Sequence, residues 1–594
     1  MSAADLSVGV IEIFLTCLRG YKIITTSLSC PEEQQSLYHR TRTQRARLTV
    51  WGDYFGLTHS TSRRYDATEK LRAHLKSSYK IGPEILDTLN NVAELFVNGR
   101  ALQEVYGLYK VAEAEDGREL LLLDPDVADI AIHGASRLPM SKARLDANRE
   151  AIAYLSHCDW EITDPDRYSA LLHKLKAAND DLYLLALPQA REMMDRALLS
   201  ELLADKDDVL TLLHIRNATA EDAEDDSPPS RGFFSGSYHT LAQAAKLRAR
   251  GNIDPFLKRR LLRPPTILER ADFALHPQLA WVGGDACLAV TNTGSAKKVV
   301  LVEFKSYLID DRAHRRLEDL VHRLAELLCA GDKPFEFRLP PCSGYFHDPS
   351  KGRFGFVYEL PPYLHLRHAE EARVPAAMSM RKPHSLMQLL KHLEPIDLGD
   401  RFRLAKQLVA AVYTIHACGF SHKNIRPASI LFLPAESGDR GGGPSKSRKV
   451  ALRRPYLMGW GYTRPDELEF EADHERRLIV PRDGTVGIYQ HPERLKSPYR
   501  PYKQIYDIYS LGLVLLEIGL WQSIESFVSE IKDFTTDEFT LYLRKRVVPD
   551  LRGQCGAIYE EVVQSCLAMK VDVEVATERV MLWDVMARLE NCRA

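Results

Sequence analysis

A polar stretch at 421–431 holds the side chains with the clearest potential for chemistry, and it ends in an apolar run. Asn424 and Ser429 are the two groups there that could meet a substrate or a metal ion. The amide nitrogen of Asn424 cannot accept a proton, because its lone pair is delocalised into the carbonyl. Ser429 offers a neutral hydroxyl, which is a poorer ligand for a divalent cation than a carboxylate or an amide carbonyl. The stretch can form hydrogen bonds, but it contains no carboxylate that could accept a proton from a substrate hydroxyl.

The same residues resemble the catalytic loop of protein kinases, whose pattern H-R-D-L-K-P-x-N precedes an apolar strand. His422, Pro427 and the apolar residues after them match this pattern. Asn424 stands in the position of the catalytic aspartate, and Ser429 stands in that of the metal-binding asparagine. The resemblance implies a loop that keeps its architecture and lacks the groups that phosphoryl transfer uses.

Further matches to the kinase pattern precede this loop. Lys305 ends the apolar run 299–305 and resembles the strand lysine that holds the α and β phosphates of a nucleotide. The segment 317–328 resembles the helix that supplies a glutamate partner to that lysine. Glu318 and Glu326 are both candidates for this partner, and the sequence does not choose between them.

Other matches follow the loop in the expected order. Gly459 lies in the segment 458–462, where the D-F-G motif belongs, and it replaces the metal-binding aspartate. Glu493 ends a segment that resembles A-P-E. Asp507 begins a segment that resembles D-x-W-S-x-G, and there it would brace the backbone of the catalytic loop. The resemblance covers about 269–594 and implies an α+β, two-lobed, protein-kinase-like fold.

Four departures from the kinase pattern concern one site. Asn424, Ser429 and Gly459 remove the base and both metal ligands, and the region before Lys305 has no G-x-G-x-x-G motif. Losing a general base alone costs about 10²–10⁴-fold in rate. We therefore interpret the domain as a pseudokinase without catalytic residues, not as an enzyme. We expect no cofactor and no magnesium, and the sequence leaves open whether ATP still binds.

The elements that position these residues follow from length and pattern. A chain of 594 residues exceeds one hydrophobic core, so about two to four domains are expected. Apolar residues recur at helical spacing through 1–215, which predicts an all-α bundle. After about 270, strand-like runs at 299–305 and 353–360 precede helical runs at 400–418, 505–521 and 556–570. The chain is thus predicted to be multidomain.

The segment 216–268 is predicted to connect the two domains. Its first part, 221–230, is acidic and ends in prolines, so it is expected to be solvated and mobile. A basic part follows, with Lys246, Arg248 and Arg250. These cations are interpreted as the exposed face of a connecting helix, with a contact to acidic lipid head groups or to the acidic part of the same segment as the alternative.

The N-terminal region carries an apolar helix from Leu6 and the later segment 44–52, with Trp51 and Gly52 at its end. These features resemble the fungal HeLo domain of prion-linked incompatibility and cell-death proteins. Gly52 is expected to end a helix, and Arg45 and Arg47 are interpreted as surface charges. The resemblance implies a membrane-acting module over 1–215.

The residues expected to insert into a membrane lie on the first helix: Ile11, Phe14, Leu15 and Leu18. The charged residues Glu12, Arg19 and Lys22 interrupt this helix, so a buried first helix of a bundle is the simpler interpretation. A third possibility is that the bundle serves only for oligomerisation.

Together the two resemblances imply a regulated cell-death or incompatibility effector, with a pairing similar to that of the mixed-lineage kinase domain-like protein. The alternatives are an atypical active kinase of the Ser/Thr type, since Lys305, His422 and Asp507 are retained, and a non-enzymatic signalling scaffold. The expected partners are acidic membrane lipids, an upstream signalling protein or kinase, and a second copy of the chain. A net charge of −2 gives no basic field for nucleic acid.

The cysteines indicate where such a protein would work. Ten cysteines are scattered without a C-x-x-C pair, which favours a reducing compartment and argues against a structural zinc site. We therefore expect a cytoplasmic protein with regulated recruitment to a membrane.

Overall fold

The computed structural model describes residues 3–26, 34–58, 64–77, 80–110, 142–156, 158, 160–203, 208–224, 235–252, 264–275, 286–292, 298–307, 314–331, 333–365, 382–392, 395–434, 450–462, 464–465, 486–496, 502–528, 535–569 and 575–594. The chain folds as two compact units, Met1–Ala249 and Arg250–Ala594. Gly283, Gly284 and Gly294 precede Lys305 in the sequence without forming a G-x-G-x-x-G motif, and they lie outside the described residues.

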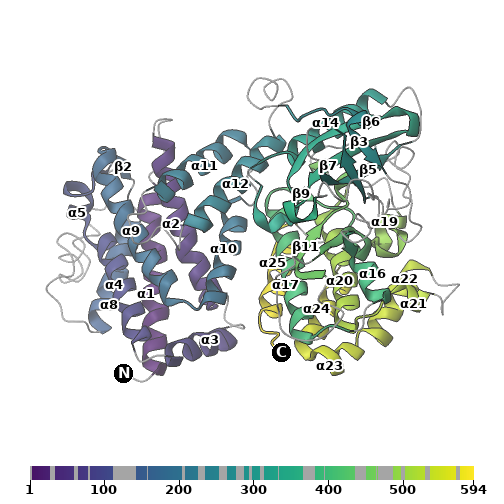
Figure 1. Ribbon diagram of the computed structural model, residues 1–594. Coiled ribbons are helices and arrows are strands. Elements are labelled where there is room, and N and C mark those ends of the chain that lie inside the picture. The colour runs from purple at the N-terminus through teal and green to yellow at the C-terminus, as the bar shows by residue number, and fades with distance from the viewer. Residues whose placement is uncertain are drawn as a thin grey trace. The chain divides into compact units, whose positions relative to one another are not determined.

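The N-terminal unit is a helical bundle with one two-stranded antiparallel sheet (Figure 1). Its helices are α1 (Ala3–Thr26), α2 (Gln35–Tyr54), α3 (Arg64–Ser77), α4 (Ile81–Val97), α5 (Gly99–Glu104), α8 (Lys142–Leu155), α9 (Pro165–Leu185), α10 (Pro188–Leu203), α11 (Val209–Glu224) and α12 (Ser235–Asn252). The strands are β1 (Leu108–Lys110) and β2 (Trp160–Ile162). The prediction of a helical bundle is confirmed.

Helix α1 runs through the middle of this bundle (Figure 1), where it packs against α2, α3, α4 and α8. Val10, Phe14, Cys17 and Tyr21 recur at helical spacing, and all four side chains are fully buried. Glu12 lies on a less buried side of the helix, which explains why this charge does not interrupt it. In this structure α1 is therefore a buried helix of the bundle, which was the simpler interpretation of its sequence.

Gly52 allows α1 and α2 to approach closely. A Cβ atom at position 52 would lie 2.0 Å from the ring of Phe14, so only glycine fits there. The prediction that Gly52 ends its helix is wrong, because α2 continues to Tyr54. The glycine serves packing between helices instead of termination.

The bundle extends beyond the boundary predicted at residue 215, to Ala249. Helices α11 and α12 carry buried side chains, including Asp222 and Tyr238, that contact α2. The part of the predicted connector at 216–224 is therefore helical, and Asp222 is buried instead of solvated. Arg248 is also buried, so it does not belong to an exposed basic face.

The C-terminal unit begins with an antiparallel five-stranded sheet in the order β3-β4-β5-β7-β6. The strands are β3 (Phe273–Leu275), β4 (Ala286–Thr291), β5 (Val299–Ser306), β6 (Cys342–Asp348) and β7 (Arg353–Glu359). In the register of β5 and β7, Glu303 lies opposite Phe356, and Lys305 lies opposite Phe354. One helix, α14 (His314–Leu328), packs against β6.

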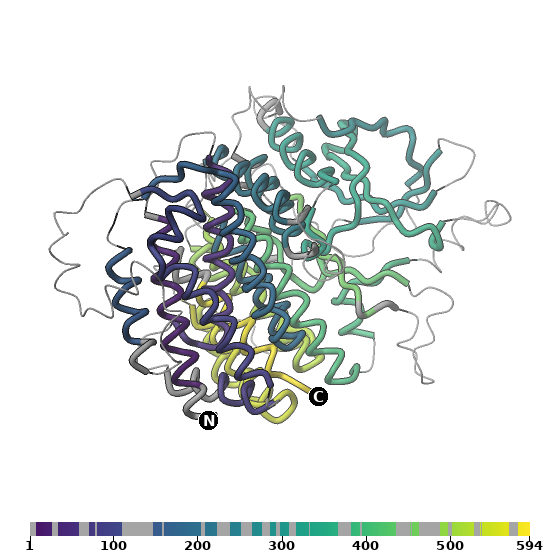
Figure 2. Tube along the Cα trace, turned by 90° about the vertical axis from the view of Figure 1, so that its left-hand side faces the viewer, coloured from purple at the N-terminus to yellow at the C-terminus, as the bar shows by residue number. Residues whose placement is uncertain are grey.

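Helices form most of the remainder of this unit: α16 (Leu386–His392), α17 (Leu398–Ala417), α19 (Pro492–Lys496), α20 (Gln504–Leu520), α21 (Glu525–Val528), α22 (Thr536–Tyr542), α23 (Asp550–Cys555), α24 (Ala557–Ala568) and α25 (Val575–Leu589). Figure 2 shows these helices apart from the five-stranded sheet. The helical runs predicted at 400–418, 505–521 and 556–570 correspond to α17, α20 and α24. Helix α20 is buried along almost its whole length because apolar residues cover all its sides.

Further strands form a three-stranded sheet, β11-β10-β8, and a two-stranded sheet, β12-β9. They are β8 (His384–Ser385), β9 (Phe420–Ser421), β10 (Ile430–Pro434), β11 (Val450–Leu457) and β12 (Arg464–Pro465). The polar stretch at 421–431 lies between β9 and β10, and the segment around Gly459 follows β11. A strand-rich part followed by a helical part is compatible with the predicted two-lobed α+β fold.

Candidate functional site

The buried carboxylate of Asp507, on α20, holds the polar stretch at 421–431 through its backbone. It accepts hydrogen bonds from the amides of His422 at 2.6 Å and Lys423 at 2.8 Å. The Tyr502 hydroxyl and the His416 ring also contact it, at 2.8 Å and 3.1 Å. Burial opposes ionisation of this carboxyl, but the bond and charge of His416 keep the pKa of Asp507 below its usual value.

This contact fixes an uncommon backbone conformation. Lys423 has a φ of 67°, in the left-handed region that non-glycine residues rarely occupy. The Asp507 carboxylate bonds the amide of this residue and that of its neighbour, so the turn is over-determined by a charged acceptor. Asp507 thus has the geometry of a brace for the loop.

The three positions predicted to have lost their chemical groups come together. The Asn424 side chain donates to the carbonyl of Gly459 at 3.3 Å and accepts from Arg426 at 2.9 Å. The Ser429 hydroxyl donates to the carbonyl of Asn424 at 2.8 Å, and its own carbonyl accepts from Met458 at 2.7 Å. Each neutral side chain therefore bonds to the protein's own backbone or to a neighbouring side chain.

Gly459 leaves no room for a ligating side chain. Its φ is 92°, and a Cβ atom there would lie 2.5 Å from the Asn424 amide nitrogen and 3.1 Å from the Ser429 Cβ. The space that a carboxylate would enter is filled by these two side chains. Among the described residues, no group of three or more His, Cys, Asp or Glu is placed to hold a metal ion.

Glu303, which the sequence analysis did not single out, lies at the centre of this site. Its carboxylate accepts from the amide of Gly459 at 3.0 Å and from that of Gly461 at 2.9 Å, and the residue is 2% exposed. Lys305 is two residues further along β5 and donates to the carbonyl of Gly461. The sequence does contain a sign of this role, because Glu303 interrupts an apolar run that is predicted to be a strand, and a buried charge there requires a partner.

Aromatic rings pack behind the same segment. The Trp460 ring stacks on Phe337 with centroids 5.6 Å apart and meets His422 edge-on at 5.0 Å. Its indole nitrogen donates to the carbonyl of Leu457 at 2.7 Å. Burial lowers the pKa of His422 to about 4, so this ring is neutral at physiological pH and serves packing.

The other predicted residues of this unit lie around the site. Pro427 begins a buried 3₁₀ turn, Pro427–Ser429. Glu493 is half exposed and lies 3.6 Å from the Lys496 ammonium. Glu326 lies 3.8 Å from the His322 ring. Burial raises the pKa values of Tyr307 and Tyr345, and the charge of Glu318 raises both further.

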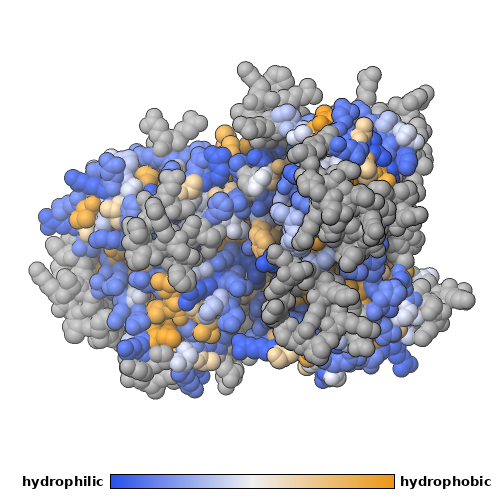
Figure 3. Space-filling model, viewed as in Figure 1, coloured by the Kyte–Doolittle hydropathy of each residue, from blue (hydrophilic) through white to orange (hydrophobic). Residues whose placement is uncertain are grey.

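The residues predicted to enter a membrane belong to the core of the N-terminal bundle. Phe14 is fully buried, and Ile11, Leu15 and Leu18 are partly buried against the same core. In the view of Figure 3, polar residues cover most of this unit's described surface, and hydrophobic residues gather in small areas. Within the described part of the chain, no helix has the length and apolar content to cross a membrane.

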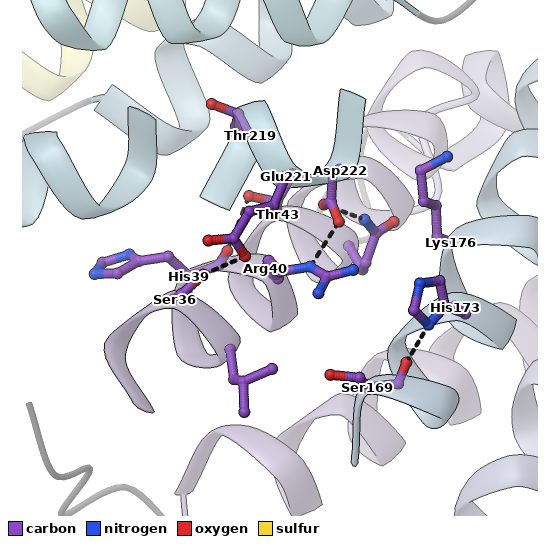
Figure 4. Close-up of polar contacts among 12 residues, drawn as sticks. Ser36, His39, Arg40, Thr43, Ser169, His173, Lys176, Thr219, Glu221 and Asp222 are labelled. Carbon is purple, nitrogen blue, oxygen red and sulfur yellow. Dashed lines mark hydrogen bonds and ion pairs between the residues drawn. The ribbon is translucent and has the colours of Figure 1, made fainter. Parts of the chain in front are cut away.

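A buried polar network joins α2 to the helices after it. The Arg40 guanidinium points at Asp222, with Nε 2.8 Å from the carboxylate, and Figure 4 shows Glu221 bonding Ser36 beside it. Gln44 also donates to Asp222, at 3.0 Å. Burial raises the pKa of Asp222, and the charge of Arg40 opposes that rise.

Arg47 contributes a second buried ion pair. Its guanidinium lies 2.6 Å from the Asp180 carboxylate on α9, and its side chain is 9% exposed. The interpretation of Arg47 as a surface charge is therefore wrong, whereas Arg45 is exposed as expected. Arg47 also helps to line a hollow with Trp51 and Tyr238.

The helical bundle, its core helix α1 and the segment around Trp51 match a known sequence family. Residues 6–215 match the sequence model of the HeLo family, described as prion-inhibition and propagation. The chain carries an N-terminal HeLo domain. No curated protein matches the chain. The predicted resemblance to the HeLo domain is thus confirmed. Helices α11 and α12 belong to the same compact unit as this domain.

Proposed function

We propose that the chain is a regulated effector of the cell-death or incompatibility type, in which the HeLo domain acts on membranes and the C-terminal unit controls it. The observation that carries the proposal is the HeLo match over residues 6–215, because it connects the bundle to prion-linked incompatibility. The proposed partners are acidic membrane lipids, an upstream signalling protein or kinase, and further copies of the chain. Recruitment from the cytoplasm to a membrane is part of the proposal.

The C-terminal unit is proposed to be a pseudokinase that does not transfer phosphate. The convergence of Asn424, Ser429 and Gly459 supports this, since the carboxylate and the metal ligands that phosphoryl transfer uses are missing from positions that lie together. The brace from Asp507 supports a conformational role for the retained architecture.

Exposure of α1 requires a signal under this proposal. Val10, Ile13, Phe14 and Tyr21 are at most 1% exposed, and burial stabilises each such side chain by roughly 1.5–3 kcal/mol. The helix therefore does not leave the folded bundle without compensation. A membrane, a partner or a modification that binds the opened state supplies the difference.

A disulfide between α1 and α4 tests whether this helix must move. A Cβ atom at Gly20 would lie 2.9 Å from the Cβ of Phe96, so Gly20→Cys with Phe96→Cys can be bridged after a small shift. The measurement is dye release from liposomes that contain acidic lipids, with residues 1–249 and with the full chain. Peptide mapping verifies that the bridge excludes Cys17.

The proposal expects residues 1–249 to release dye, the full chain to release less, and the bridged variant to release none until it is reduced. The reduced form of the same variant is the control for damage to the core. A folded 1–249 unit that stays inert, or one that releases dye equally when bridged, contradicts the proposed action of α1. In the first case a soluble pull-down partner would favour the scaffold interpretation.

A further inference from the structure

The glutamate and lysine of β5 both reach the segment after β11. Glu303 and Lys305 are two residues apart on one strand, so their side chains leave the same face of the sheet. Both contact Gly461, Glu303 at its amide and Lys305 at its carbonyl. Glu303 also reaches the amide of Gly459, which is distant by 156 positions in the chain.

The amides of Gly459 and Gly461 both donate to the carboxylate of Glu303. They converge on one carboxylate, at 3.0 Å and 2.9 Å, and backbone N–H groups that converge in this way bind carboxylates and phosphates alike. Gly459 adopts a φ of 92°, a backbone conformation that glycine tolerates better than other residues do. The cation of Lys305 lies beside the site, so the local charge also suits an anion.

We propose that Glu303 is an internal ligand that fills a phosphate-type anion site made by the amides of Gly459 and Gly461 with Lys305. The carboxylate occupies the amide donors beside Lys305, the residue predicted to hold phosphates, and it excludes a polyphosphate there by occupation and by charge. The C-terminal unit is thereby held in one state without nucleotide or metal. This inference stands whether or not the HeLo domain acts on membranes.

Burial supports a ligand-like role over a surface charge. A carboxylate that is 2% exposed must be hydrogen-bonded to be tolerated, and both amides are its partners. The reverse also holds, because removing the carboxylate leaves two inward-facing amides without that acceptor. Water or an anion from solution can then bond these amides, and the neighbouring cation of Lys305 favours the anion.

The test compares Glu303→Ala with the wild-type full chain, with inorganic tripolyphosphate as the probe and no divalent cation. Glu359→Ala is the matched control, because this glutamate lies on the neighbouring strand β7 and is exposed. Thermal unfolding and calorimetric binding are measured at constant ionic strength. Magnesium-free ATP follows as a second probe.

Glu303→Ala is expected to lower the melting temperature, and tripolyphosphate is expected to raise it again. The variant should bind the probe at least tenfold more tightly than the wild type does. Adding Lys305→Ala to it should abolish that gain. Should Glu303→Ala not fold, Glu303→Gln keeps the test, because its neutral amide accepts more weakly and should give a smaller gain in the same direction.

Two results would overturn the proposal. One is equal binding of tripolyphosphate by the wild type and by the Glu303 variants, which would mean that the carboxylate does not compete. The other is a Glu303→Ala variant as stable as Glu359→Ala, which would mean that the two amide contacts do not hold the segment.

Discussion

Gly459 and Asn424 exclude any larger residue from the centre of the C-terminal site: a Cβ atom on the glycine would lie 2.5 Å from the amide nitrogen of the asparagine. The absence of a side chain at 459 is therefore matched by a neighbour that fills the space. Two neighbouring side chains thus surround this position, and we expect that a single substitution back to a ligating residue does not restore metal binding.

Gly459→Asp is expected to destabilise the protein and to give no magnesium-dependent binding of ATP. The positive φ costs a non-glycine residue on the order of 1–3 kcal/mol, and the collision with Asn424 adds to this. Thermal shift with ATP, with and without magnesium, measures both effects. Gly331→Asp is the control, since a Cβ atom there meets nothing within 4 Å. A magnesium-dependent rise for Gly459→Asp would contradict this expectation.

Glu517 is expected to make the stability of the C-terminal unit fall with rising pH. Burial raises the pKa of its carboxyl from 4.5 to about 8, although the Tyr489 hydroxyl and the Ile524 amide bond one of its oxygens. The folded state keeps a proton that the unfolded state releases, so between these two pH values each rise in pH favours unfolding.

Glu517→Gln should flatten this dependence, because an amide does not titrate. Denaturant unfolding of both proteins at several pH values between 4.5 and 8 measures the slope. Glu525→Gln serves as the control, since that nearby carboxylate pairs with Lys391 at 2.6 Å. Parallel curves for the wild type and Glu517→Gln would mean that Glu517 does not hold the extra proton.

Gly52→Ala is expected to destabilise the HeLo domain. Replacing a glycine in a helix interior by alanine ordinarily stabilises by roughly 0.5–1 kcal/mol. Here the new methyl would lie 2.0 Å from the Phe14 ring, and overpacking of a core costs about 1–3 kcal/mol. Gly9→Ala, where the nearest atom is 3.6 Å away, should show the ordinary gain.

A double-mutant cycle identifies the cause. Phe14→Leu removes the ring, including the Cζ and Cε atoms that a methyl at 52 would meet, so its combination with Gly52→Ala should cost less than the sum of the two single changes. Additive costs in urea unfolding would show that the glycine matters for a reason other than contact with Phe14.

Asp222→Ala is expected to cost about 3–5 kcal/mol, because it leaves the buried Arg40 guanidinium without its carboxylate. Glu221→Ala is the control, since that neighbour is exposed and bonds the rim residue Ser36 in Figure 4. The free energy of unfolding of residues 1–249 measures both. A fragment of residues 1–215 should be as unstable as the Asp222→Ala variant of residues 1–249. If residues 1–215 were instead as stable as unchanged residues 1–249, α11 and α12 would not belong to the folding unit.

Local patterns were sufficient for the elements of both units. The apolar spacing of the first helix, the strand run that ends at Lys305 and the helical runs that became α17 and α20 all depend on residues close in sequence. The same holds for the motif at 422–429, because its identity lies in the order of neighbouring residues. The N-terminal resemblance also depended on residues close in sequence, and the HeLo match over 6–215 confirms it.

Long-range partners decided which charges are buried, and here local interpretation was wrong or silent. Arg47 and Asp222 were interpreted as solvated, yet Asp222 pairs with Arg40 across 182 positions. Glu303 was overlooked, although it is bonded to Gly459 across 156 positions. A charged side chain enters a core only where another segment supplies its counter-charge or donors, and no window of sequence contains both.

Residue types alone show that the loop at 422–429 has no carboxylate and has a serine where the kinase pattern has its metal-binding asparagine, because the atoms of a side chain set what it can donate, accept or ligate. What occupies the emptied site depends instead on contacts between distant segments. The carboxylate of Glu303 and the amide of Asn424 reach it from separate strands and loops, and close packing leaves their positions to the fold.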